Sequence, residues 1–164
     1  TEKIARRGVR VPSEYAADYL DQLWVKDVAS RDVITLNALD TLAAVRAWLE
    51  TAVVGTQHHG FPVLDAGGRL LGVATRRQVS DRRHADSTRV GELLDGAPAV
   101  AFADSSLREA ADLMVVEGIG RLPVVTQAEP HKVIGILTRS DLLSAHGRRL
   151  HEDRPMKRQS KGGV

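Results

Sequence analysis

Apolar and polar positions form two blocks along the chain, and the two blocks repeat the same order of patterns. Each block begins with a short apolar run, continues with apolar residues at helical spacing, and ends with two apolar runs around a polar turn. In the first block these patterns predict strands at 33–36, 61–64 and 69–74, and a helix through Leu42, Val45, Trp48 and Leu49. Gly67 and Gly68 lie between the last two strands, a pair typical of a hairpin turn.

The second block predicts the same elements. Strands are expected at 100–102, 122–126 and 132–137, and a helix through Leu107, Ala110, Ala111, Met114 and Val115. This helix should end at Gly118, because glycine readily takes the left-handed conformation that follows many helices. A further short helix follows each hairpin, near 75–78 in the first block and over 142–146 in the second. Each block therefore reads β-α-β-β-α.

A repeated phrase shows that the blocks are two copies of one module. Pro62 and Pro123 occur in matching strands 61 residues apart, and Gly72 and Gly135 are 63 residues apart. One copy of roughly 60 residues buries too little surface to be very stable alone. We therefore expect an α/β (α+β) fold in which the copies pack as a pseudo-twofold pair, with a cleft on each side. The expected divisions are a lead-in at 1–23, modules at 24–80 and 90–147, a linker at 81–89 and a basic disordered tail at 148–164.

Composition removes several classes of site. The chain of 164 residues has no cysteine, which excludes disulfides and thiolate zinc sites, and no apolar run is long enough to span a membrane. The net charge of +2 conceals two basic ends around a mildly acidic body. A solvated tail explains the basic C-terminal end, and a membrane surface is the alternative. The tail has no aromatic residue that would stack on bases, so no nucleic-acid partner is expected.

The turn before the last helix has the residues that a nucleotide site requires. Thr138 and Ser140 offer hydroxyl groups at a helix start, and the Asp141 carboxylate can accept hydrogen bonds from both hydroxyls of a ribose. The alternative is that Ser140 and Asp141 only cap the helix. The first copy has Thr75 and Gln78 at the matching positions, so it lacks the carboxylate.

The repeated order, the Leu-Pro-Val strand and the Thr-x-x-Asp turn together resemble the CBS domain family over residues 24–144. The resemblance implies a regulatory pair that binds ATP, ADP or AMP between its modules. Carried over to this chain, it assigns nucleotide contacts to Thr138, Ser140, Asp141, Ile34, Thr35, His58, His59, Gly60 and Phe61. It assigns Thr75, Gln78, Val100 and Arg121 to a second cleft, which should be weak or empty because Gln78 replaces the acid.

Two other features near these clefts have competing interpretations. His58 and His59 are adjacent in an expected strand, where side chains point to opposite faces, so no shared metal site is expected. Arg121 and Arg139 lie beside the turns, where arginines either meet phosphates or stay solvated.

Two segments resemble CLC chloride channels and transporters more narrowly. They are residues 1–8, similar to the segment after the last membrane helix, and the Gly-Phe-Pro-Val phrase at 60–63. The basic run of Lys3, Arg6, Arg7 and Arg10 suits a cytoplasmic segment next to a membrane, and the start without Met suits a C-terminal piece. The resemblance implies a homodimer at the cytoplasmic face of the membrane, with the transmembrane domain of the same chain as its partner.

Two further hypotheses remain open at this point. The pair could regulate another host, such as a dehydrogenase or a cation transporter, or it could be a structural dimerisation module without a ligand. No catalytic residues are expected, because the chain has no Gly-x-Ser-x-Gly, no His-Glu-x-x-His and no Walker phosphate loop.

Overall fold

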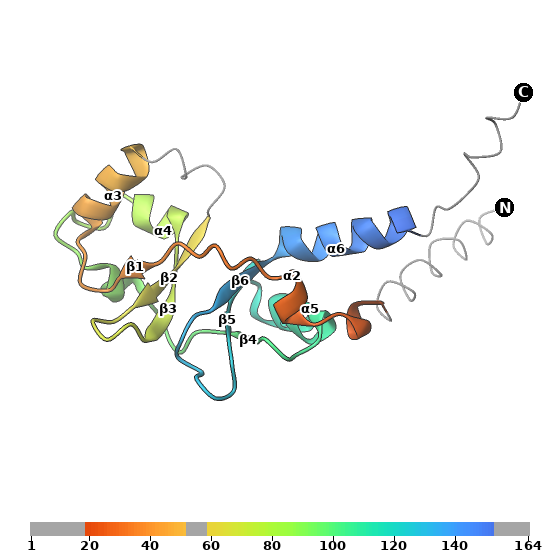
Figure 1. Cartoon of the computed structure of the whole chain (residues 1–164). Coiled ribbons are helices and arrows are strands. Elements are labelled where there is room, and N and C mark those ends of the chain that lie inside the picture. Colours follow the sequence, from red (N-terminus) through yellow and green to blue (C-terminus); the bar gives the residue numbers. More distant parts are fainter. Residues whose placement is uncertain (1–18, 52–58, 153–164) are drawn as a thin grey trace, which may run out of the picture.

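The structure, a computed structural model, describes residues 19–51 and 59–152 and contains two sheets of three strands each (Figure 1). In the first sheet the strands are β1 (Leu36–Asn37), β2 (Gly60–Leu64) and β3 (Leu70–Thr75). β1 runs parallel to β2, and β2 runs antiparallel to β3. The helices of this copy are α3 (Leu42–Thr51) and α4 (Arg76–Ser80).

The second sheet repeats this arrangement with β4 (Ala101–Phe102), β5 (Arg121–Val125) and β6 (Gly135–Thr138). Its helices are α5 (Leu107–Glu117) and α6 (Arg139–Glu152). β4 is parallel to β5 and β5 is antiparallel to β6, as in the first sheet. The predicted α/β fold with two β-α-β-β-α copies is confirmed.

Local chemistry explains where the elements begin and end. The Asp65 carboxylate accepts hydrogen bonds from the backbone N–H groups of Gly67 and Arg69, both at 2.9 Å, which closes the β2–β3 turn. The Ser106 hydroxyl accepts from the Glu109 N–H at 3.2 Å and caps the start of α5. α5 ends at Gly118, whose φ of 66° lies in the left-handed region, as predicted.

The two copies exchange their opening segments. The short helix α2 (Val25–Val28) precedes the first sheet in sequence but packs with the second, beside α5 and α6 (Figure 1). The Val25 N–H donates to the Ser105 carbonyl at 2.9 Å, and the Leu107 N–H donates to the Leu23 carbonyl at 2.9 Å. Val25 is fully buried in the second core, so this core is completed from the first copy.

The reciprocal contact completes the first core. The 3-10 helix η2 (Val90–Leu93) opens the second copy in sequence, yet Val90 is fully buried in the first core. The Val90 N–H donates to the Asp40 carbonyl at 2.9 Å, and the Leu42 N–H donates to the Thr88 carbonyl at 2.8 Å. These bonds match those of the other copy residue for residue at a spacing of 65, which shows the pseudo-twofold relation of the pair.

Three elements differ from the sequence prediction, namely β1, β6 and α6. β6 begins at Gly135, whereas a strand was expected over 132–137. β1 contains only Leu36 and Asn37, whereas a strand was expected over 33–36. α6 continues to Glu152, so residues 148–152 are helical and are not part of a disordered tail. The extension is explained by Arg149, which is buried and has its guanidinium carbon 5.1 Å from the centre of the Tyr19 ring. Residues 153–164 lie outside the described part of the chain.

Candidate functional site

The turn between β6 and α6 forms a reciprocal helix cap. The Thr138 N–H donates to Asp141 Oδ2 at 2.8 Å, and the Asp141 N–H donates to Thr138 Oγ1 at 3.2 Å. Asp141 therefore caps α6, and whether it also contacts a ribose stays a prediction. Its carboxylate is half-buried, and its other oxygen accepts no hydrogen bond from any described residue. A hydrogen bond from a ligand hydroxyl to that oxygen would not require the cap to break.

The first copy forms the same cap with an amide. The Thr75 N–H donates to Gln78 Oε1 at 2.8 Å, and the Gln78 N–H donates to Thr75 Oγ1 at 3.1 Å. A neutral amide oxygen thus performs the structural role of the Asp141 carboxylate. What distinguishes the two turns is the negative charge on Asp141, which the cap does not require.

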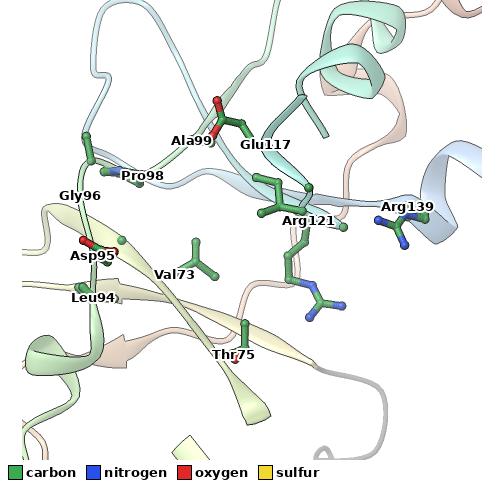
Figure 2. Close-up of a pocket in the computed structure, with 15 residues that line it drawn as sticks. Val73, Thr75, Leu94, Asp95, Gly96, Pro98, Ala99, Glu117, Arg121 and Arg139 are labelled. Atoms are coloured by element: carbon green, nitrogen blue, oxygen red, sulfur yellow. The ribbon is translucent and has the colours of Figure 1, made fainter. Parts of the chain in front are cut away.

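A cavity of about 450 Å³ lies between the two copies. β3 of the first copy forms one wall, and the chain from the end of α5 into β5, together with the first residue of α6, forms another (Figure 2). The segment that joins η2 to β4 completes the lining. The lining residues are Gly72, Val73, Thr75, Leu94, Asp95, Gly96, Ala97, Pro98, Ala99, Glu117, Gly118, Ile119, Gly120, Arg121 and Arg139.

Two arginines supply positive charge to this cavity. Burial, together with the nearby guanidinium of Arg139, lowers the pKa of Arg121 below its ordinary value. Neither arginine forms an ion pair with any carboxylate of the described residues. The cavity therefore holds two like charges, neither of which has an ion-pair partner among the described residues.

Two carboxylates, those of Asp95 and Glu117, also line this cavity. Figure 2 shows the Asp95 and Glu117 side chains apart from the Arg121 and Arg139 guanidinium groups, with Thr75 nearer to Arg121. The part of the cavity beside the two arginines thus suits phosphate, whereas the separate positions of Asp95 and Glu117 suit hydrogen-bond donors such as hydroxyl or amino groups.

The structure brings together only some of the predicted site residues. Of the residues assigned to the second cleft, Thr75 and Arg121 line the cavity, while Gln78 caps α4 and Val100 lies just before β4. The formed cavity is therefore in the cleft that was expected to be weak. Whether that cleft binds more weakly stays a prediction.

The residues assigned to the first cleft are more dispersed. Ile34 packs against the first core, and Thr35 lies in a separate hollow beside Trp48. The Phe61 side chain is a core residue, with its ring 6.1 Å from that of Trp48 in an edge-on arrangement.

Three more residues of the first cleft are described. Ser140 is exposed in the first turn of α6, and His59 is exposed with its carbonyl accepting from the Arg76 N–H at 2.8 Å. Gly60 is buried against the Arg121 side chain. His58 lies outside the described residues, as does the rest of 52–58.

The prediction missed the segments 94–99 and 117–119 and residues Gly72 and Val73. The repeat itself contained a signal for part of this set. Segment 94–99 follows η2 as 29–34 follows α2, and Ile34 was already assigned to the first cleft. Mapping the assignment onto the second copy would have found the segment.

Comparison with known proteins decides the family. The CBS domain family model matches residues 25–84 and again residues 90–148. The chain belongs to the CBS domain family. CBS domain pairs are regulatory modules found in many hosts, and the two matches cover both copies described above.

Relatives of this CBS pair occur in different proteins. It is 31% identical over 118 residues to inosine-5'-monophosphate dehydrogenase of Methanocaldococcus jannaschii, a match that covers 71% of the chain but only 22% of the dehydrogenase. A crystal structure of CBSX2 in complex with AMP is 25% identical with a TM-score of 0.63, covering 80% of this chain and 98% of that one. The cytosolic domain of the Mg2+ channel MgtE in complex with ATP is 25% identical with a TM-score of 0.62, and the match covers 71% of this chain and 46% of that one.

Two kinds of feature are absent from the described residues of the CBS pair. No group of three or more His, Asp or Glu side chains there is placed to hold a metal ion. No helix in the same part of the chain has the length and apolar character required to cross a bilayer.

Proposed function

We propose that this CBS pair is a regulatory module that binds an adenine nucleotide between its two copies. The observation that supports the proposal is the inter-copy cavity of about 450 Å³, which is within the usual size range of small-ligand sites and contains Arg121 and Arg139. The solved structures of CBSX2 with AMP and MgtE with ATP support the same ligand class. In the opposite cleft, the Asp141 oxygen outside the cap would accept hydrogen bonds from the ribose hydroxyls.

Calorimetric titration with ATP, ADP and AMP tests the proposal, and Asp141→Gln is the informative variant. Glutamine recreates the cap that Gln78 forms at the matching position, so the variant removes the charge but keeps the helix start. Loss of a charge-assisted hydrogen bond should weaken binding in that cleft by about 10- to 100-fold. Unchanged affinity and stoichiometry would remove Asp141 from the ribose role, and no heat with any nucleotide would refute the function.

Regulation requires that the nucleotide favour one conformation of the host. A ligand with equal affinity for two states shifts neither, however tightly it binds. The pair would act on its host through the relative position of the two copies, because a ligand in the cavity touches β3 of one copy and β5 of the other.

For the host, we propose the cytoplasmic domain of a CLC-type chloride channel or antiporter. The supporting features are the basic lead-in at 1–10 and the phrase at 60–63, both of which are sequence resemblances. The intact gene tests this directly. Several apolar stretches of about 20 residues encoded upstream of Thr1 would support a membrane host. A dehydrogenase barrel around the pair would instead support an enzyme host.

A structural dimerisation role is favoured by a different observation. α5 exposes 82% of Val115 and 78% of Val116, and α6, which packs against α5, exposes 67% of Leu143. The matching residues of the first copy are Glu50, Thr51 and Ser80, so only the second copy exposes apolar side chains there. Such exposed apolar groups are typical of an interface.

Charge suggests that a second copy of the chain covers this face. The exposed charged residues of α5 are Arg108, Glu109, Asp112 and Glu117, and those of α6 are Arg139, Arg148 and Glu152, so the exposed face of α5 is net acidic and that of α6 is net basic. In a twofold dimer with α5 opposite the partner's α6, these groups would be complementary. Sedimentation analysis should show a dimer that Val116→Glu dissociates, with Thr51→Glu as the matched control. A monomer at all concentrations would refute this interface.

A further inference from the structure

We infer that the cavity lined by Thr75, Arg121 and Arg139 selects its ligand by phosphate charge, and that the two arginines are the selecting residues. The inference rests on the proposed function, because it assumes that an adenosine compound enters the space between the copies. It goes further in distinguishing the two clefts. The Asp141 cleft would recognise the ribose, whereas this cavity would recognise the phosphate.

One glycine makes room for the Arg121 side chain, and a second lies within ordinary contact distance of Arg139. A Cβ atom on Gly60 would lie 2.6 Å from Arg121 Cδ and 3.0 Å from its Nη1, so any larger residue would displace that side chain. A Cβ atom on Gly120 would lie 3.5 Å from Arg139 Cζ and from its Nη2. Arg121 therefore crosses from β5 of the second copy onto β2 of the first, and Arg139 lies against the chain that enters β5.

The charges near these arginines are not neutralised by the protein. The described carboxylates that line the cavity are Asp95 and Glu117, and neither forms an ion pair with an arginine. Figure 2 places both carboxylates away from the guanidinium groups. Arg121 is partly desolvated and is repelled by the Arg139 guanidinium, and an anion between the two would offset that repulsion. Arginine is suited to this role because its planar donors match phosphate oxygens.

The arrangement predicts an order of affinity among adenosine compounds. AMP and ATP provide phosphate oxygens for the arginines, whereas adenosine and 5'-methylthioadenosine provide none. S-adenosylmethionine carries a positive sulfonium beside the adenosyl group, which the arginine pair would repel. We therefore expect AMP and ATP to bind at least about tenfold more tightly than the three ligands without phosphate.

Calorimetry in the Asp141→Gln background tests this order, because that change weakens the opposite cleft. The titrants are ATP, AMP, adenosine, 5'-methylthioadenosine and inorganic pyrophosphate. Arg121→Met and Arg139→Met should each weaken AMP and ATP binding by about 10- to 100-fold and leave adenosine unchanged. Arg82→Met is the control, since it removes an equal charge from an exposed site in the segment that joins the two copies, outside the cavity. Thermal melting verifies that each variant is folded. Because Arg139 is exposed, its replacement should disturb the packing of the protein less than the replacement of Arg121.

The outcomes separate the two proposals. Adenosine binding as tightly as AMP, or AMP affinity unchanged in both arginine variants, would overturn the selection by phosphate while the proposed function stands. Pyrophosphate binding that either arginine variant abolishes, with no binding of any adenosine compound, would keep the anion site and refute the nucleotide function. No binding of any of the five titrants would refute both.

Discussion

The buried arginine of the first copy gives the sharpest test of what holds the inter-copy segment in place. Arg46 on α3 is only 7% exposed. Its Nε donates to the Val79 carbonyl at 2.8 Å, and its Nη2 donates to the carbonyls of Asp81 at 2.7 Å and His84 at 3.1 Å. Its Nη1 donates to Asp86 Oδ1 at 2.7 Å. The Arg46 side chain thus hydrogen-bonds α3 to residues 79–86, the first half of the connection between the two copies.

Replacing Arg46 by alanine removes all four hydrogen bonds. A net loss of about 1 kcal/mol for each bond, together with the vacated space, gives an expected destabilisation of about 3–5 kcal/mol. That is a large part of the total stability of about 5–15 kcal/mol typical of a domain. Asp86→Ala should cost less than about 1 kcal/mol, because the Asp86 side chain is 66% exposed and the pair is therefore screened by solvent.

Urea unfolding followed by circular dichroism measures both changes. Arg46→Met retains most of the stem volume, so its difference from Arg46→Ala separates packing from hydrogen bonding. Amide hydrogen exchange over 81–89 should accelerate in Arg46→Ala if the arginine fastens this segment. A loss below about 1 kcal/mol with an unchanged urea dependence would refute the reasoning. It would show that water replaces the guanidinium at these carbonyls.

Two further substitutions test the caps and the exchanged segments. Gly118→Ala should destabilise by about 1 kcal/mol in thermal unfolding, because Gly118 has a φ of 66° and no atom lies within 4 Å of the added Cβ, so only backbone strain acts. An equal change for Gly147→Ala, at a helical site with the same open surroundings, would contradict that explanation. Val25→Ala should cost about 2 kcal/mol, because Val25 is fully buried, and should weaken packing around α5. Nuclear magnetic resonance shifts confined to the first sheet would contradict the exchange.

The hairpins were predictable because their signals are local. Asp65 and Gly68 specify the first turn within a few residues of the strands that they join, and the observed strands begin or end within one or two residues of the expected positions. The second hairpin followed from the repeated proline strand. The Thr138–Asp141 cap was also visible in sequence, since a reciprocal cap requires only residues three positions apart.

The exchange of segments was not predictable from periodicity. Val25 and Val90 each lie in a short segment with apolar residues, and the sequence of such a segment does not indicate which of the two sheets it packs against. The same holds for Arg46 and Arg121, whose contacts lie far away in sequence. From sequence alone an isolated arginine is expected to be solvated, because the carbonyls or glycines around it are known only from the fold. The length of α6 was underestimated for the same reason, because the contact between Arg149 and Tyr19 joins residues that are far apart in the sequence.

The exchanged opening segments also determine the order in which the chain can fold during synthesis. The first core can close once Val90 has left the ribosome, because its sheet and α3 precede that residue. Val25 is made long before its partners Leu107, Leu122 and Leu137, so it has no native site until the second copy is nearly complete. The second core therefore closes by joining the two ends of the described chain, a contact of high sequence separation that slows folding. A nascent chain that stops within the second copy would have a folded first core and an exposed α2 without its packing partners.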